Sequence, residues 1–290
     1  MKLRIVIILF ISIIIAIITM TSWAVRHSLF APDKHMIWAP DEYVDMMIED
    51  VNGFDTINSW YVKNNEKSTC MLFFHGNNGN MSWREYMVNM TKEIGVNLFM
   101  IDYRGFGKSR GNPTQRSLLE DGESAYRYIT KKYKNCDIIV WGESLGGAIA
   151  SHVASKHKCR CLVLLSTFSS LDDVVLEYHG NYAIRYLMSL LIKYIVEEMP
   201  IKSWIKCVKS PVVIIHSKSD ETIPFEVSNT LFENISHEQK THIKIKGKHS
   251  SPEMTRDNLM EILDICGISF NGKTITKALK CIDNIKFPIV

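Results

Sequence analysis

The stretch Trp141-Gly142-Glu143-Ser144-Leu145-Gly146-Gly147 places one serine between two glycines, directly after the apolar run 138–141. The run predicts a short buried strand, and the pattern after it predicts a helix that begins at about Leu145. Ser144 is therefore expected at a sharp strand-to-helix turn, where a strained backbone needs small neighbours. Such a nucleophile elbow exposes the hydroxyl beside the free N–H groups of the helix start. Because G-x-S-x-G alone is a weak signal, a turn without chemistry remains the alternative until partners for the serine are found.

The composition bounds the class of protein. The chain of 290 residues is 46% hydrophobic and 22% charged, which is typical of one sizeable globular domain with an additional segment. A net charge of +3, with lysines scattered along the chain, argues against a nucleic-acid partner. The seven cysteines contain no C-x-x-C pair and no histidine at zinc-ligand spacing, so we expect neither a metal site nor a dense disulfide framework.

The additional segment lies at the N-terminus. Residues 5–25 are almost all aliphatic, and about 20 such residues span a bilayer as a helix. The competing interpretation is a cleaved signal peptide, but the apolar core of such a peptide is only about 7 to 15 residues long. We therefore expect residues 1–25 to form a transmembrane anchor of a single-pass membrane protein. Basic residues stand on both sides of the apolar run, so the topology stays open.

After a lead-in, residues 26–43, strand and helix patterns alternate through a predicted domain, residues 44–270. Strands are expected at 44–48, 57–62, 70–74, 97–101, 138–141, 161–165 and 211–216, with helices between most of them. This alternation predicts an α/β fold in which helices cover both faces of a mostly parallel sheet. Residues 271–290 are left as a lysine-rich C-terminal tail.

Three helix starts have local signals. Ser82-Trp83-Arg84-Glu85 has the form of a capping box that opens a helix through Ile94. Ser251-Pro252-Glu253 has the form of an N-cap followed by proline at the first helical position, and Pro224 fits the first turn of another helix.

A serine hydroxyl needs a base to take its proton, and the base needs an orienting carboxylate. In a fold with a nucleophile elbow these partners follow the serine in the order acid, histidine, on loops at the carboxyl ends of strands. Asp220 and His249 obey that order and position. The adjacent Asp172 and Asp173 are an alternative source of the acid, whereas Glu221 is expected to face solvent or to cap the following helix.

The tetrahedral intermediate also needs hydrogen-bond donors for its oxyanion. The N–H of Leu145, the residue after the nucleophile, is one candidate. The N–H of Asn77, in the Phe74-His75-Gly76-Asn77 turn after the strand 70–74, is the other. A turn rich in glycine and asparagine without any such role is the alternative.

Five ordered blocks resemble a known group: 74–80 (FHGNNGN), 102–109 (DYRGFGKS), 142–147 (GESLGG), 220–224 (DETIP) and 247–249 (GKH). From about residue 44 to 267 the chain is similar to α/β hydrolases of the membrane-anchored bud-emergence type. The resemblance implies Ser144 as nucleophile, Asp220 as acid, His249 as base, and Asn77 with Leu145 as oxyanion donors. It also implies an N-terminal membrane segment, in agreement with residues 5–25.

Other residues of these blocks are expected around the site rather than in the reaction: His75, Gly76, Asp102, Arg104, Gly142, Glu143 and Gly146. The loop 102–109 lacks the spacing of a phosphate-binding loop, so Asp102 and Arg104 are expected to brace the edge of the site.

Residues 169–200 form the predicted cap insertion. Tyr182, Leu187 and Leu191 belong to an apolar stripe near helical spacing, which is expected either to cover the serine and line an acyl pocket or to pack on the sheet. Contact of this stripe with a membrane is a further hypothesis.

The sequence thus predicts a membrane-anchored serine hydrolase that cleaves carboxylic esters or thioesters through an acyl-Ser144 intermediate. Its substrate would be a small-molecule or lipid acyl ester or thioester, and no cofactor or metal is required. Amide cleavage and acyl transfer by the same residues stay open. The alternative from another class is a noncatalytic hydrolase-like scaffold that binds lipid or protein.

Overall fold

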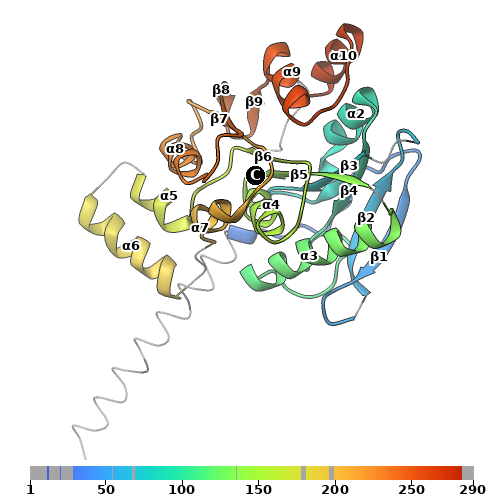
Figure 1. The fold of residues 1–290 in the computed structure, drawn as a ribbon. Coiled ribbons are helices and arrows are strands. Elements are labelled where there is room, and N and C mark those ends of the chain that lie inside the picture. Colours follow the sequence, from blue (N-terminus) through green and yellow to red (C-terminus); the bar gives the residue numbers. More distant parts are fainter. Residues whose placement is uncertain are drawn as a thin grey trace, which may run out of the picture.

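The computed structural model describes residues 12, 20, 29–53, 55–66, 69–134, 136–177, 181–195 and 199–282. Within these residues one sheet has the strand order β1-β2-β4-β3-β5-β6-β7-β8-β9 (Figure 1). The strands are β1 (Val44–Glu49), β2 (Asp55–Val62), β3 (Thr69–Phe74), β4 (Asn97–Ile101), β5 (Asp137–Glu143), β6 (Cys161–Leu165), β7 (Val212–Ser217), β8 (Lys240–Lys248) and β9 (Ser251–Glu253). The neighbouring strands β4, β3, β5, β6, β7 and β8 are parallel. The strands β1, β2 and β9 pair antiparallel at the two margins of the sheet. The predicted mostly parallel sheet is confirmed.

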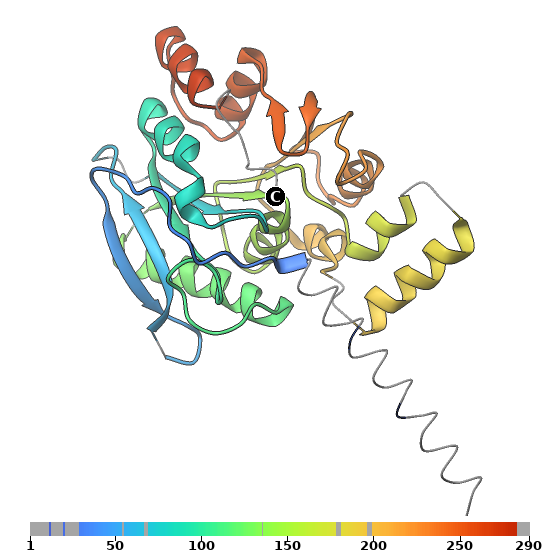
Figure 2. The ribbon, with the colours of Figure 1, turned by 180° about the vertical axis from the view of Figure 1, so that it is seen from behind.

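Helices cover both faces of this sheet (Figures 1 and 2). On one face lie α3 (Gln115–Lys132), α4 (Leu145–Lys156), α7 (Ile201–Trp204) with the short η2 (Ile205–Cys207), and α8 (Glu226–Glu233); on the other lie α2 (Glu85–Ile94), α9 (Arg256–Ile265) and α10 (Gly272–Ile282). In β5, Ile138 and Val140 pack into the first layer, and Ile139 and Trp141 pack into the second. A strand buried on both faces explains why its sequence is continuously apolar.

The segment expected as a tail contains a packed helix. α10 lies against α2 and α9, and its Ile275, Ala278 and Ile282 are buried in the same core as the inner face of α2. This segment is rich in lysine, but the apolar residues between the lysines recur at spacings of three and four, which is the pattern of an amphipathic helix.

The capping box predicted at Ser82 is wrong, although the helix through Ile94 is confirmed. A short 3₁₀ turn, η1 (Met81–Trp83), precedes α2, and α2 begins at Glu85 without a side-chain cap. The Ser82 hydroxyl donates to Asn80 Oδ1 at 2.6 Å and accepts from the Ile37 N–H at 3.0 Å. A partner 45 residues away has therefore replaced the local cap.

The other two predicted helix starts are displaced. Ser251-Pro252-Glu253 forms the strand β9, and α9 begins later, where Thr255 accepts from the Asn258 N–H in a capping box. Pro224 lies just before α8 rather than in its first turn, although its carbonyl accepts from the Val227 N–H.

The predicted cap insertion contains α5 (Leu171–Glu177) and α6 (Tyr182–Ile195), which pack on each other. Figures 1 and 2 show α6 standing apart from the sheet and its covering helices. No helix among the described residues is long and apolar enough to cross a bilayer. The predicted anchor at 5–25 lies outside the described residues, apart from Ser12 and Met20.

Candidate active site

Ser144 lies at the predicted turn between β5 and α4. Its backbone has φ 49° and ψ −117°, a conformation that non-glycine residues rarely adopt. The turn is held by the Ser144 N–H, which donates to the Leu165 carbonyl at 2.9 Å, and by the Thr167 hydroxyl, which donates to the Ser144 carbonyl at 2.7 Å. The strain is therefore maintained by the neighbouring strand β6 and the loop that follows it.

The glycines of the elbow are required by close packing. A Cβ at Gly142 would lie 2.4 Å from the Gly146 carbonyl oxygen, and a Cβ at Gly146 would lie 2.1 Å from the Phe74 carbonyl oxygen. Both distances are shorter than any real contact of a Cβ. The helix α4 can thus approach β3 and β5 only because these two positions lack side chains.

The structure brings Ser144, His249 and Asp220 into one hydrogen-bonded line. His249 Nε2 lies 3.1 Å from Ser144 Oγ, and His249 Nδ1 lies 2.8 Å from Asp220 Oδ2. Because the carboxylate can only accept, the Nδ1 carries a proton that it donates, and Nε2 is left to accept from the serine hydroxyl. The imidazole is 17% exposed and the Asp220 side chain is fully buried.

Asp220 is held by more donors than His249 alone. The Thr222 and Ile223 N–H groups donate to its Oδ1 at 2.9 and 2.7 Å, and His216 Nε2 lies 3.4 Å from its Oδ2. Burial raises the pKa of this carboxyl group, but the hydrogen bonds from His216 and His249 outweigh it and hold the pKa well below its usual range. Asp220 is therefore an ionised partner for the imidazole.

Sequence reasoning missed His216. It is a fully buried residue in the apolar strand β7, four positions before Asp220. A titratable side chain in an otherwise apolar strand was the available signal, since such a group needs a buried partner.

His249 lies in the two-residue turn between the antiparallel strands β8 and β9, not before a helix as predicted. The His249 N–H donates to Glu221 Oε2 at 3.0 Å, and the Ser217 hydroxyl donates to the Gly247 carbonyl. Glu221 was expected to face solvent or to cap a helix; it is exposed, and its carboxylate in addition holds the backbone of the histidine turn.

The alternative acids do not lie beside His249. Asp173 pairs with Lys202 Nζ at 2.7 Å and accepts from the Ser169 hydroxyl at 2.7 Å. Burial raises the pKa of Asp173, but the hydrogen bonds from Lys202 and Ser169 lower it, and the net result is a pKa below the usual value. Asp172 lies on the same first turn of α5. The Asp173 carboxylate therefore ties the start of α5 to α7 rather than orienting the histidine.

The turn after β3 passes close to the nucleophile. A Cβ at Gly76 would lie 3.4 Å from the Ser144 Cβ. His75 Nδ1 lies 2.7 Å from the Gly76 carbonyl oxygen, which points that carbonyl toward the imidazole. In a trans peptide the C=O and the following N–H point in opposite directions, so the Asn77 N–H is turned away from His75. The Leu145 N–H, at the first position of α4, has no acceptor within its own helix.

Asp102 and His75 join the loops after β4 and β3. Asp102 Oδ1 accepts from the Met81 N–H at 2.7 Å and lies 3.3 Å from His75 Nε2, with both side chains fully buried. The hydroxyl of Tyr103 donates to the His75 carbonyl at 2.7 Å. Asp102 thus braces the turn that contains Gly76 and Asn77.

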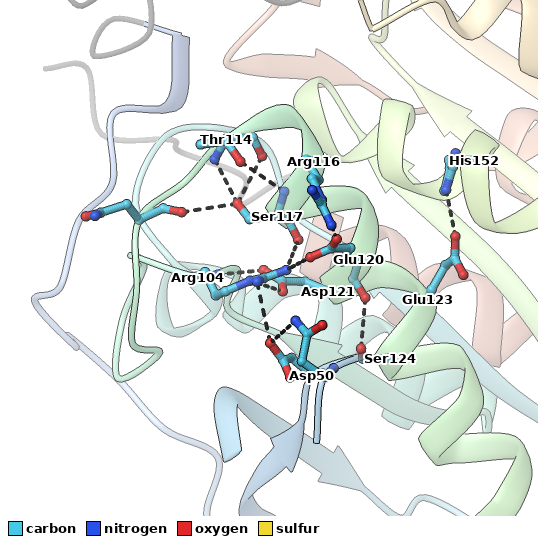
Figure 3. Close-up of polar contacts among 12 residues, drawn as sticks. Asp50, Arg104, Thr114, Arg116, Ser117, Glu120, Asp121, Glu123, Ser124 and His152 are labelled. Atoms are coloured by element: carbon cyan, nitrogen blue, oxygen red, sulfur yellow. Dashed lines mark hydrogen bonds and ion pairs between the residues drawn. The ribbon is translucent and has the colours of Figure 1, made fainter. Parts of the chain in front are cut away.

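Arg104 braces a different contact, between the loop after β4 and α3 (Figure 3). Its Nε donates to Asp121 Oδ1 at 2.6 Å, and its Nη2 donates to Glu120 Oε2 at 2.8 Å. Nη1 lies 3.6 Å from Asp50 Oδ2. Burial raises the pKa of Asp121 to about 7 against the opposing effect of Arg104. Arg104 therefore fixes the outer side of this loop.

A second buried arginine was also missed. Arg84 is 1% exposed, donates from Nη2 to the Asn78 carbonyl at 2.7 Å, and has its Nε 3.6 Å from Glu143 Oε2. The hydroxyl of Tyr86 donates to Glu143 Oε1. Glu143 directly precedes Ser144, so this cluster links the elbow to the turn that contains Asn77. In the sequence Arg84 stood only as a middle residue of the supposed capping box.

Comparison with known proteins agrees with this architecture. A model of a family described as the alpha/beta hydrolase fold matches residues 69–187. The uncharacterized protein YfhR of Escherichia coli K12 is 29% identical over 241 residues, which cover 78% of this chain and 80% of that protein. Protein bem46 of Schizosaccharomyces pombe is 31% identical over 167 residues, covering 55% of this chain and 54% of that protein. The bem46 match fits the resemblance drawn from the five sequence blocks.

Among solved structures, the Pyrococcus furiosus esterase Pf2001 superposes with a TM-score of 0.62 at 18% identity, covering 85% of this chain and 98% of that one. At this low identity the match shows a similarity of fold only. The strand order, the helices on both faces, the strained turn after β5 and these matches together establish that the chain has the α/β-hydrolase fold.

Proposed function

We propose that this protein is a serine hydrolase that cleaves carboxylic esters or thioesters through an acyl-Ser144 intermediate. The observation that supports the proposal most directly is the hydrogen-bonded line from Ser144 through His249 to Asp220 at a strained turn. A strained backbone costs free energy, and its persistence at a reactive serine favours a functional role.

In the proposed acylation step, Ser144 Oγ attacks the substrate carbonyl carbon while its proton moves to His249 Nε2. Asp220 accepts from Nδ1 and stabilises the imidazolium that forms. The negative charge on the former carbonyl oxygen is stabilised by the N–H groups of Leu145 and Asn77. Collapse of this intermediate expels the alcohol or thiol, which takes the proton from His249 Nε2, and leaves the acyl group on Ser144.

In the proposed deacylation step, a water molecule gives its proton to His249 Nε2 and attacks the acyl carbon. The second tetrahedral intermediate then releases the carboxylic acid, and the proton returns to Ser144 Oγ. The same residues would support amide cleavage, or acyl transfer if an alcohol replaced the water. Esters and thioesters are preferred because their leaving groups depart more easily than an amine.

We also propose that residues 5–25 anchor the protein in a membrane as a single span. The support is the length of the apolar run and the resemblance to anchored α/β hydrolases. In this proposal the catalytic residues sit in a domain that begins a short distance after the anchor.

The test is covalent labelling of the full-length protein in detergent with a fluorophosphonate probe, which reacts with activated serines. We expect labelling of the wild type and none of the Ser144→Ala variant, whose loss of one hydroxyl leaves the elbow backbone unchanged. A folded wild type that stays unlabelled would favour the noncatalytic scaffold instead. Labelling that persists in Ser144→Ala would assign the activated serine to another position.

A further inference from the structure

α6 exposes an apolar surface that no part of the described chain covers. Five of its large side chains are exposed over two successive turns: Tyr182 (66%), Ile184 (62%), Tyr186 (49%), Leu187 (65%) and Met188 (39%). Single exposed apolar residues are ordinary, but a group of neighbouring ones marks a surface that meets a partner or a membrane. Ile184, Leu187 and Met188 share one side of the helix, at spacings of three and four, and Tyr182 and Tyr186 share another side, at a spacing of four. We call Ile184, Leu187 and Met188 the α6 face.

α6 is held to the rest of the molecule through α5, not by packing its stripe on the sheet. The two helices lie against each other, and Arg185 Nη1 donates to the Leu176 carbonyl at 2.5 Å. Figures 1 and 2 show α6 at the margin of the molecule. Of the two arrangements that the sequence left open, packing on the sheet is therefore wrong for the α6 face.

The charges of α6 suit a lipid surface. Between Tyr182 and Ile195 the only charged residues are Arg185 and Lys193, and there is no acidic residue. Tyrosines and basic residues beside long aliphatic side chains are typical of helices that lie in the headgroup region of a bilayer.

The fold places α6 on the same side of the molecule as the nucleophile. Ser144 follows the carboxyl end of β5, and α5 follows the carboxyl end of the neighbouring strand β6. The carboxyl ends of parallel strands share one edge of a sheet, and helices that return between them end at the opposite edge. The insertion with α6 therefore leaves the domain at the edge where Ser144 lies.

The N-terminal segment reaches the same edge. Asn77, after the carboxyl end of β3, donates from Nδ2 to the Leu29 carbonyl at 3.1 Å, and Phe30 is buried in the core. Only three residues, 26–28, separate Leu29 from Val25, the end of the predicted anchor, and the four residue steps from Val25 to Leu29 extend at most about 14 Å. If the anchor spans a bilayer, the oxyanion turn lies within about that distance of the bilayer surface.

From these two independent features we propose that the α6 face docks on the phospholipid bilayer that contains the anchor. The edge of the sheet with Ser144 then faces the membrane, and the acyl substrate is a lipid-borne ester or thioester that reaches the serine from the bilayer. This statement about the substrate rests on the proposed hydrolase activity; the docking itself does not.

Docking is tested with a probe on α6 in the full-length protein, reconstituted into phosphatidylcholine vesicles with a minor fraction of phosphatidylserine. In a Cys207→Ser background, which removes the exposed native thiol, an environment-sensitive fluorophore is attached at Leu187→Cys. The matched control is Lys131→Cys, an exposed position in the last turn of α3 and therefore at the opposite edge of the sheet.

Lipids with a nitroxide on the acyl chain should quench the probe at 187 and leave the probe at 131 bright. A probe at 187 that is not quenched, whether it stays in water or is covered by a second copy or another protein, would overturn the proposal. This readout requires no enzymatic activity.

The substrate is tested with Leu187→Asp against Lys131→Asp. Leu187→Asp should lower turnover of a long-chain ester embedded in vesicles several-fold and leave turnover of a short soluble ester unchanged, whereas Lys131→Asp should change neither. An equal loss on both esters would show that α6 is only structural. If the wild type turns over neither ester, the hydrolase proposal fails while the quenching result still decides the docking.

Discussion

Asp220 and Glu143 are two buried carboxyl groups within electrostatic range of His249, and their surroundings differ. Asp220 accepts hydrogen bonds from two backbone N–H groups and faces two histidines. Glu143 accepts from Tyr86 through Oε1, and its Oε2 lies 3.6 Å from Arg84 Nε.

The pKa values of the two groups move in opposite directions. Burial raises both, but for Asp220 the hydrogen bonds from His216 and His249 outweigh it, so the pKa falls. For Glu143 burial outweighs Arg84 and Tyr86, so the pKa rises. The hydrogen-bond donors around each carboxyl group therefore help to separate the two acids. Asp220 is suited to hold a charged imidazolium, and Glu143 is suited to brace the elbow.

The largest effect is expected from Asp220→Asn. The amide N–H of asparagine can donate to His249 Nδ1, which favours the wrong tautomer, with the proton on Nε2. The uncharged amide also no longer stabilises the imidazolium. We expect turnover of a model ester to fall about 10⁴-fold. Steady-state kinetics measure this fall, and the Asp173→Asn variant is the control that should retain activity. Near-normal turnover in Asp220→Asn would mean that Asp220 is not the acid.

Arg84→Met should have the next largest effect, on stability. It leaves Glu143 buried without its cationic neighbour and removes the donor to the Asn78 carbonyl. Breaking a buried charge pair on one side costs about 3 to 5 kcal/mol of the free energy of unfolding. Urea unfolding followed by tryptophan fluorescence measures this loss. Arg84→Lys keeps the charge and should recover part of it, and a Met variant as stable as the wild type would show that the pair is dispensable.

Asp220 and Glu143 also differ in how much of their surroundings could be predicted from the sequence. The alternating strands and the order Ser144, Asp220, His249 were predictable, because parallel strands bring their carboxyl ends to one edge whatever the details of packing. Asp220 and His249 were found through their place in the chain, after β7 and β8.

The supporting contacts could not be predicted in the same way. Tyr86 and Glu143 are 57 residues apart, and nothing local in the sequence pairs them. The supposed cap at Ser82 failed for the same reason, since its hydroxyl is taken by Asn80 and the Ile37 N–H. Local motifs state what a side chain can bind, and tertiary packing decides which of the available partners it binds.

The smallest effect, and the most direct test of the contrast, is the pH dependence of stability in Glu143→Gln and Asp220→Asn. Glu143 has a folded pKa above its unfolded value of about 4.3, so the stability it contributes is present below that pH and is lost as the pH rises toward the folded pKa. Asp220 has a folded pKa below its unfolded value of about 3.9, so its contribution is present above that pH and is lost as the pH falls.

Urea unfolding of the full-length protein in detergent, repeated from about pH 3.5 upward, measures both effects, since this range starts below the unfolded pKa values of the two acids. Relative to Glu143→Gln, the wild type should lose stability as the pH rises; relative to Asp220→Asn, it should gain stability over the same rise. Because both variants replace a carboxyl group by an amide of the same size, the opposite slopes would come from protonation and not from volume. Slopes of the same sign would show that burial, and not the donors, governs both acids.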